Sequence, residues 1–319
     1  MFRTITRSDR QWMEHCRREG TNDMTVLSFP AVCMWQSAFG LTIDGDEHFY
    51  VVKSEADHGY YYPVGEEAAC RNYVRSLLEE AASQKTPEEA SSRLKFVYVP
   101  EKELGWLEEL GFTVSCDPDT SEYVYSSHSL ALEDNGSGTN YRVKVRHFSR
   151  DNVWHSKTLA FPGDEALLRE KTAEWDRTSG GGTAGFDVQQ TCTMAPGDTG
   201  AVWLHTSDRL AALAAAKDPA GIGLSGVYIE TDTGEWAYLL GYPSNDRIYD
   251  MSIIKYSPDL SRNAVPLCIC EMAKRVCTDY PYINLEDDLG NPGLRRMKQL
   301  YHPLFLLDSY TAVRDPDPV

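Results

Sequence analysis

Apolar and polar residues follow two spacings in the first part of the chain, one typical of strands and the other typical of helices. Runs rich in β-branched and aromatic residues predict strands at residues 24–29, 49–53, 95–99 and 112–116. Apolar positions at helical spacing predict a helix at residues 65–83, and a shorter helix at residues 101–110 ends before Gly111. This alternation predicts α/β layering.

A second set of alternating elements occupies the rest of the chain. The same patterns predict helices at residues 167–177, 207–217 and 264–277, and strands at residues 226–230, 235–240, 248–255 and 282–284. Residues 134–140, between the two sets, are turn-forming and almost free of apolar side chains. We therefore expect a mixed α/β protein of two domains, residues 1–135 and residues 136–319.

The segment at residues 140–148 carries a different alternation. Arg142, Lys144 and Arg146 alternate with Val143 and Val145, which predicts a strand with one cationic face. Such a face either meets phosphate groups or protects a solvated edge strand from pairing with another chain. Both interpretations stay open on the sequence alone.

The composition is that of an ordinary globular protein with an acidic balance. Hydrophobic residues make up 42%, charged residues 25%, and the formal net charge is −17. A polyanion is repelled by nucleic acid unless it carries a local basic patch, so DNA is excluded as an expected partner and tRNA is disfavoured. No apolar run approaches the roughly 18 residues of a membrane span, and the N-terminal residues lack an apolar signal core. We expect a cytoplasmic protein without a membrane span.

Residues 282–298 bring acidic, glycine and basic residues together in one turn-and-helix unit. Three carboxylates, Glu286, Asp287 and Asp288, precede a turn at residues 290–293, and a helix beginning near residue 294 carries Arg295, Arg296 and Lys298. Because the helix dipole disfavours cations at an N-terminus, these cations are expected to face an anionic ligand or the three carboxylates.

The same stretch resembles the C-terminal signature of proteins similar to the phosphatidylglycerol lysyltransferase C-terminal domain. Positions that match it are Asn284, Glu286, Asp288, Leu289, Gly290, Gly293, Leu294, Arg295, Lys298, Tyr301 and Pro303. Two further blocks, Tyr123-Val124-Tyr125-Ser126 and Tyr62-Pro63-x-Gly65, also resemble family segments. The resemblance covers nearly the whole chain and implies tandem GNAT-like domains. At residues 140–148, where relatives carry a basic helical block, only Arg142, Val145 and Phe148 match.

Transfer of an aminoacyl or similar acyl group to an amine or hydroxyl is the activity that the resemblance implies. Such a site needs carboxylates for an ammonium group, a cation for negative charge, and a base. We assign Glu286 and Asp288 to the ammonium group or the base, and Lys255, Arg295 and Lys298 to negative charge. The remaining predicted substrate-binding residues are Arg142, Asn284 and Tyr301.

Two structural alternatives compete with this assignment. The acidic turn and basic helix are also typical of an ion-pair network that only fixes a turn, and a strand lysine such as Lys255 is often merely solvated. The alternative function is therefore a non-catalytic ligand-binding protein that retains the GNAT-like fold.

Acetyl-CoA is disfavoured as a cofactor. The one match to the pyrophosphate-binding motif of GNAT domains, at residues 177–182, follows a predicted helix rather than a strand and favours a flexible loop through Gly185. The expected location at residues 256–264 has no glycine. No cofactor is expected, and an aminoacyl-tRNA remains a candidate donor because the relatives use one.

No metal site is expected from the sequence. The chain has eight cysteines and no Cys-x-x-Cys pair, so reduced, mostly buried thiols are predicted. Cys268, Cys270 and Cys277 in particular are predicted to be buried rather than metal-ligating, because no histidine stands at ligand spacing. The sequence contains no recognisable Ser-His-Asp arrangement and no phosphate-binding Walker motif.

Overall fold

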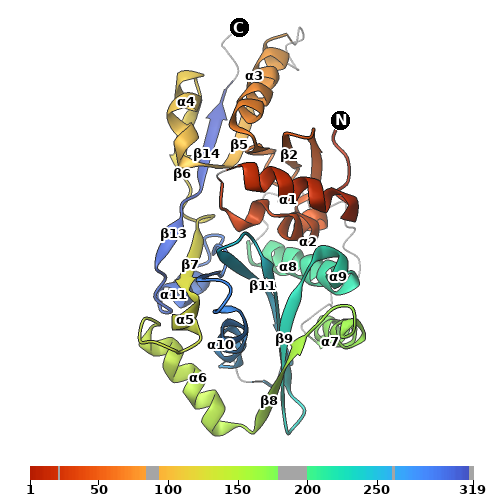
Figure 1. Ribbon diagram of the computed structural model, residues 1–319, viewed down its shortest axis with the longest axis vertical. Helices are drawn as coiled ribbons and strands as arrows, with labels where there is room; N and C mark the ends of the chain where they lie inside the picture. Colours follow the sequence, from red (N-terminus) through yellow and green to blue (C-terminus); the bar gives the residue numbers. More distant parts are fainter. Residues whose placement is uncertain (21, 84–92, 179–199, 261–262, 316–319) are drawn as a thin grey trace.

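A computed structural model describes residues 1–20, 22–83, 93–178, 200–260 and 263–315 of the chain, and it contains two mixed sheets (Figure 1). The first sheet consists of β1 (Leu41–Gly45), β2 (Phe49–Ser54), β3 (Gly59–Tyr61), β4 (Val64–Gly65), β5 (Leu94–Val99), β6 (Thr113–Cys116) and β14 (Tyr310–Arg314). The second consists of β7 (Glu122–Ser126), β8 (Trp154–Leu159), β9 (Ser225–Thr231), β10 (Trp236–Pro243), β11 (Ile248–Tyr256), β12 (Tyr282–Asn284) and β13 (Phe305–Leu307).

The helices belong to both units. They are α1 (Arg10–Glu19), α2 (Phe29–Phe39), α3 (Glu67–Ser83), α4 (Leu104–Glu109), α5 (Ser127–Leu130), α6 (Thr139–Asp151), α7 (Glu165–Thr178), α8 (Gly200–Lys217), α9 (Pro219–Ile222), α10 (Ala264–Val276) and α11 (Pro292–Gln299). The two mixed α/β units confirm the predicted tandem GNAT-like class of fold. None of the helices in the described ranges is long and apolar enough to cross a bilayer.

The two sheets exchange strands across the middle of the chain. β14 lies between β5 and β6 of the first sheet, with antiparallel pairing to both, although it follows every strand of the second sheet in sequence. In Figure 1 this blue strand stands among the orange and yellow strands of the first unit. Conversely, β7 pairs with β12 and β13 in the second sheet. Each sheet therefore takes strands from both sides of residue 135, and the predicted division into residues 1–135 and 136–319 does not coincide with the division between sheets.

Helix α2 lies between the two units. Phe29 and Val32 belong to the core beneath β1 and β2, whereas Ala31 and Met34 pack with α8 and with β10 of the second sheet. Apolar side chains therefore occupy most of this helix, with Gln36 and Ser37 as the exceptions.

The other helices cover the second sheet. α6 and α10 pack on one of its faces, whereas α7 and α8 pack on the other face beside α2. The second sheet is therefore covered on both faces.

Two predicted strands are helical in the structure. Residues 24–29 form a short 3₁₀ turn followed by the start of α2, because the side chain of Ser28 accepts a hydrogen bond from Ala31 N and Pro30 occupies the first helical turn. Residues 140–148 lie within α6. The buried side chains of that helix, Tyr141, Val145 and Phe148, recur at helical spacing, and this packing outweighs the alternation of Arg142, Lys144 and Arg146.

Candidate functional site

A cavity of about 420 Å³ lies between the two sheets, beside α2. Its apolar wall comes from both units and includes Val26, Trp35, Tyr61, Leu239 and Met251. The acidic turn after β12 closes the opposite side and contributes carboxylates from the charged signature. The cavity therefore combines an apolar lining with a strongly polar end, which is the usual character of a small-molecule site.

Lys298 holds the acidic turn in place. Its side chain is 5% exposed, and its ammonium group donates to the backbone carbonyl oxygens of Leu285 at 2.7 Å, Glu286 at 3.0 Å and Asp287. Burial lowers the pKa of Lys298, and the neighbouring carboxylates act in the opposite direction. The three carbonyl groups use its three donors, so Lys298 acts on the backbone of the turn.

Asp288 and Arg295 form a closed pair beside this clamp. The Asp288 carboxylate is fully buried and accepts from Arg295 Nε at 2.8 Å, from the Arg295 terminal nitrogen at 2.7 Å and from Tyr123 Oη at 2.6 Å. It also accepts from Gly290 N at 2.9 Å. Burial alone would raise the pKa of Asp288, but these donors together lower it. Arg295 also contacts Asp119 at 2.6 Å, so the pair is satisfied from within the protein.

Asn284 joins the acidic turn to the first unit. Its side-chain amide donates to Glu122 Oε2 at 2.6 Å, and its oxygen accepts from Glu286 N at 2.7 Å. Glu122 in turn accepts from the backbone nitrogens of Thr25 at 2.8 Å and Val26 at 3.0 Å. Although burial raises the pKa of Glu122, these three donors hold its carboxylate across the boundary between the units.

Glu286 and Asp287 are the carboxylates that face the cavity with fewer protein partners. Ser252 Oγ donates to Glu286 Oε1 at 2.6 Å, and the backbone of Glu286 has a φ angle of 60°, which is unusual for a residue other than glycine. Burial raises the pKa of Glu286 well above its ordinary value, and it raises that of Asp287 to about 7. Both side chains line the cavity.

Asp250 lies next to this pair on β11. It is fully buried, and both of its carboxylate oxygens lack a hydrogen-bond partner among the described residues. Burial and the charge of Glu122 raise its pKa. The charge of Asp250 in turn raises the pKa of Glu286, so negative charge is concentrated beside this end of the cavity and favours a cation.

Lys255 occupies the far end of β11. Its side chain is buried, its ammonium group lies 2.5 Å from Asp208 Oδ1, and it stands 4.6 Å from the centre of the Trp175 ring. Burial lowers the pKa of Lys255. Asp208 lines the cavity and Lys255 does not, so the lysine contacts the cavity only through its partner.

Two predicted substrate-binding residues lie elsewhere. Arg142 on α6 donates to the backbone oxygen of Asp134 at 2.6 Å. Tyr301 is buried in the core of the second unit, where its ring lies 4.9 Å from that of Tyr141. Neither residue lines the cavity. The arrangement thus brings Glu286, Asp288, Asn284, Arg295 and Lys298 into one corner and leaves Arg142, Tyr301 and Lys255 outside it.

Sequence reasoning missed three groups at this corner. Glu122 lies on β7 and Ser252 lies on β11. No local sequence pattern predicts that these strands pair with β12 and pack around the cavity. Asp250 could have been found from the sequence, because a carboxylate in the middle of an otherwise apolar predicted strand is unusual. The glycine run at residues 180–185 lies outside the described residues.

The fold and the site define a protein of two mixed α/β units with an acidic cavity between them. The profile of the family described as "Phosphatidylglycerol lysyltransferase, C-terminal" matches residues 24–313. The chain belongs to this family, which confirms the resemblance noted in the sequence. No curated protein matches the chain in sequence at a significant level.

Three solved structures share the fold along almost the whole chain. A conserved protein of unknown function from Bacteroides thetaiotaomicron is 23% identical, with a TM-score of 0.76 over 98% of each chain. The C-terminal domain of a putative lysylphosphatidylglycerol synthetase from Agrobacterium fabrum is 12% identical, with a TM-score of 0.63 over 97% of this chain and 93% of that one. L-PGS from Bacillus licheniformis is 12% identical, with a TM-score of 0.60 over 98% and 93%.

Proposed function

We propose that this protein transfers an aminoacyl group, or a similar acyl group bearing an ammonium, to an amine or hydroxyl acceptor. Membership of the lysyltransferase C-terminal family supports the class of reaction. The observation that carries the proposal is the pair of adjacent carboxylates, Glu286 and Asp287, at the polar end of an otherwise largely apolar cavity. The apolar wall would accommodate the carbon chain, and the carboxylates would bind the ammonium.

The electrostatics of the cavity favour a cationic ligand. Glu122, Asp208, Glu286 and Asp287 line it, whereas Lys298 is the one cation among its described lining residues. Burial makes ionised carboxylates unfavourable and raises the pKa values of Glu286 and Asp287. A bound ammonium would relieve that cost, because an opposite charge within hydrogen-bond distance favours the ionised form.

Asp287 is our candidate for the general base. A base is most effective when its pKa lies near the working pH, and burial raises the pKa of Asp287 to about 7. The carboxylate would accept the proton of the attacking amine or hydroxyl as the new acyl bond forms. It would return that proton to the donor's ester oxygen as the ester bond breaks, so that the donor leaves as an alcohol. Asp288, with its lowered pKa and its Arg295 pair, is a positioning residue that fixes the turn carrying Glu286 and Asp287.

The alternative function is binding without transfer, and one observation favours it. Each of the cations predicted to steady negative charge is already engaged: Arg295 by Asp288, Lys298 by backbone carbonyls, and Lys255 by Asp208. A phosphate-bearing donor would therefore have to be held by groups other than these. A protein that only binds an ammonium-bearing ligand needs no such groups.

A binding assay followed by a transfer assay separates the two functions. Calorimetry would compare alaninamide and lysinamide with N-acetylalaninamide, which lacks the α-ammonium. We expect the free amides to bind, Asp287→Asn and Glu286→Gln each to weaken binding about tenfold or more, and Asp259→Asn, a change at an exposed aspartate, to leave it unaltered.

The transfer assay would supply a mixture of labelled aminoacyl-tRNAs together with amines, alcohols or phosphatidylglycerol vesicles. Label reaching an acceptor, and loss of that label in Asp287→Asn, would support transfer. Binding of the amides without transfer would support the alternative function. If no free amide binds the wild-type chain, both functions fail.

A further inference from the structure

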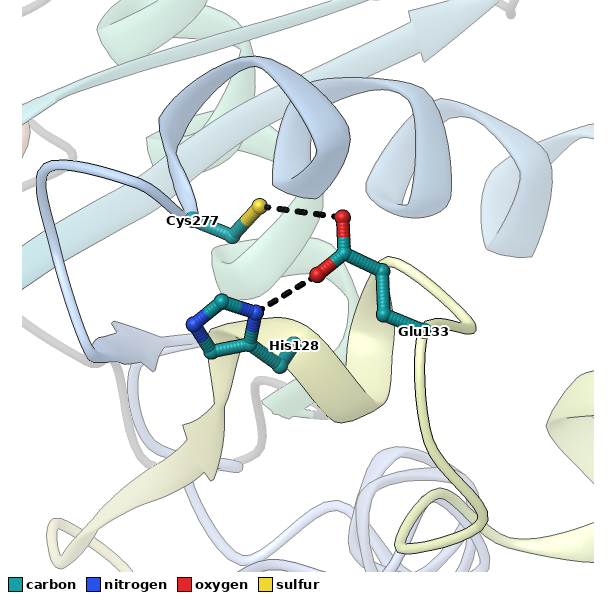
Figure 2. Close-up of side chains that lie close together, drawn as sticks. All are labelled: His128, Glu133 and Cys277. Carbon is teal, nitrogen blue, oxygen red and sulfur yellow. Dashed lines mark hydrogen bonds and ion pairs between the residues drawn. The ribbon is translucent and has the colours of Figure 1, made fainter.

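A second cluster of reactive side chains lies outside the cavity, at the C-terminal end of α10. His128, Glu133 and Cys277 place one ligand atom each within 4.8 Å of the others (Figure 2). His128 Nδ1 lies 2.6 Å from Glu133 Oε2, and Cys277 Sγ lies 3.6 Å from Glu133 Oε1. None of the three residues lines the cavity between the units, so the functional proposal leaves this cluster without a role.

The fold, rather than a local motif, brings these groups together. His128 belongs to α5, and the chain turns back after it so that Glu133 N donates to His128 O at 3.0 Å. Leu132 takes a positive φ of 64° in this turn, which directs Glu133 towards the histidine. Cys277 caps α10, with its backbone nitrogen 2.9 Å from Ala273 O. The sulfur therefore comes from a segment 144 residues away from Glu133.

The arrangement does not suit an activated cysteine nucleophile. Such a thiol needs a base or a positive charge beside it, which favours the thiolate. Here the Glu133 carboxylate stands between the sulfur and the imidazole, as Figure 2 shows. Burial and the charge of Glu133 both raise the pKa of Cys277.

We propose that His128 Nδ1, the Glu133 carboxylate and Cys277 Sγ bind a divalent transition-metal ion of the zinc class. Nitrogen, oxygen and sulfur donors together are typical of Zn²⁺, which prefers four ligands in a tetrahedron. Three protein ligands leave the fourth position to water. The imidazole and carboxylate are each about half exposed, so an ion can approach from solvent, while the buried sulfur forms the floor of the site.

Binding would exchange protons for metal bonds. The Cys277 S–H bond breaks, a sulfur–metal bond forms, and the thiol proton leaves to solvent. A proton on His128 Nδ1 moves to the other ring nitrogen through solvent, so that Nδ1 presents its lone pair to the ion. The nearby carboxylates of Asp134 and Asp279 favour the added positive charge.

The ion would tie two parts of the second unit together. α5 follows directly after β7, and Cys277 precedes β12, the strand that pairs with β7 and leads into the acidic turn. A metal bond between these segments would brace the strand pair beneath the candidate site without entering the cavity. The proposal therefore stands or falls independently of the transferase function.

Cobalt substitution tests the site in the full-length chain. Co²⁺ added to reduced, metal-free protein should give a sulfur-to-cobalt charge-transfer band and visible bands of tetrahedral intensity at one ion per chain. Cys277→Ser should abolish the charge-transfer band, and His128→Gln and Glu133→Gln should each weaken Zn²⁺ binding at least about tenfold. The matched control is Cys116→Ser, which changes an exposed cysteine on β6 and should leave the bands unaltered.

Absence of a charge-transfer band in the wild-type chain would overturn the proposal. A band that survives in Cys277→Ser with unchanged stoichiometry would overturn it as well. Circular dichroism of each variant without metal establishes that the fold is retained. Because Cys277→Ser alters a buried position, His128→Gln, at an exposed one, provides a second test that does not depend on the core.

Discussion

Asp288 and Asp287 are neighbours in sequence and opposites in environment. Asp288 is fully buried, is surrounded by donors, and its pKa is lowered. Asp287 faces the cavity, its pKa is raised to about 7 by burial, and its backbone rather than its carboxylate is held by Lys298. The Asp288 carboxylate has its hydrogen-bond partners within the protein, whereas the Asp287 carboxylate favours a cation from outside.

The difference teaches how the charged signature works. Most of its cations and one of its carboxylates, Arg295, Lys298 and Asp288, stabilise a turn. That turn places Glu286 and Asp287 at the wall of a largely apolar cavity. The conspicuous ion pairs therefore fix the turn, and Glu286 and Asp287 are the residues that we propose bind the ligand.

The largest effect is expected when the satisfied carboxylate is removed. Asp288→Asn leaves Arg295 facing a neutral amide and disrupts a buried ion pair, so we expect it to lower the free energy of unfolding by about 3 kcal/mol. Asp287→Asn is the matched change, and it should keep or raise stability. Urea denaturation at neutral pH measures both, and equal losses in the two variants would contradict the distinction between them.

The same pair should differ in the pH dependence of stability. The pKa of Asp287 rises from 3.8 in the unfolded chain to about 7 in the folded protein. The folded protein therefore binds more protons in this window, and the Asp287 contribution to stability is lost as pH rises through it. Asp288, with its lowered pKa, contributes stability above pH 3.8 that is lost on further acidification. Asp287→Asn should thus flatten only the loss towards neutral pH.

A smaller loss should follow from removing the clamp on the turn. Lys298→Met leaves three backbone carbonyls without their ammonium donor, and we expect it to lower the free energy of unfolding by about 2 kcal/mol. Because Lys298 lowers the pKa values of Glu286 and Asp287, the variant should also raise both further. Arg296→Met, at an exposed neighbour, should change stability by less than about 0.5 kcal/mol. Similar losses in both variants would argue against the clamp.

The pH dependence of ligand affinity should further distinguish Asp287 from Asp288. Alaninamide needs an ionised Asp287, so its affinity should rise by up to about tenfold per pH unit between about pH 5.5 and about pH 7, where the ligand remains an ammonium. Asp287→Asn should remove most of this slope. Calorimetry at matched ionic strength measures it, and an unchanged slope in the variant would assign the titration to another group.

The smallest effect is expected at Arg142. The arginine, on α6, donates to the backbone oxygen of Asp134 and lies outside the cavity. Arg142→Ala should therefore alter neither amide binding nor stability by more than about 0.5 kcal/mol. A tenfold loss of binding would show that α6 approaches the ligand after all.

Local patterns in the sequence predicted elements that are marked by apolar runs, β-forming residues or turn residues. The helix at α10, the strands at β10 and β11, and the turn before α11 were all predicted from periodicity and turn chemistry. Helix α2 was missed because apolar side chains on both of its packed faces leave only Gln36 and Ser37 to mark a polar side. In α6 the charged residues happen to alternate, and this hid the helical spacing of Tyr141, Val145 and Phe148.

The site could be predicted only as far as sequence neighbours extend. The signature located Glu286, Asn284, Arg295 and Lys298 in one corner. It could not reveal that the Asp288 carboxylate is paired with Arg295, or that Glu122 contacts Asn284 from a strand distant in sequence. The same limit applies to Cys277, whose proximity to His128 and Glu133 depends on the pairing of β7 with β12.

The position of β14 has a consequence for how the chain is made. This strand separates β5 from β6 and completes the first sheet, yet it is synthesised after every strand of the second sheet. Domains generally fold in order as they leave the ribosome, but here the N-terminal unit cannot close until residues 310–314 have been translated. The second unit must therefore form beside an unfinished neighbour, and a nascent chain stalled before Tyr310 would expose the gap between β5 and β6 to other chains.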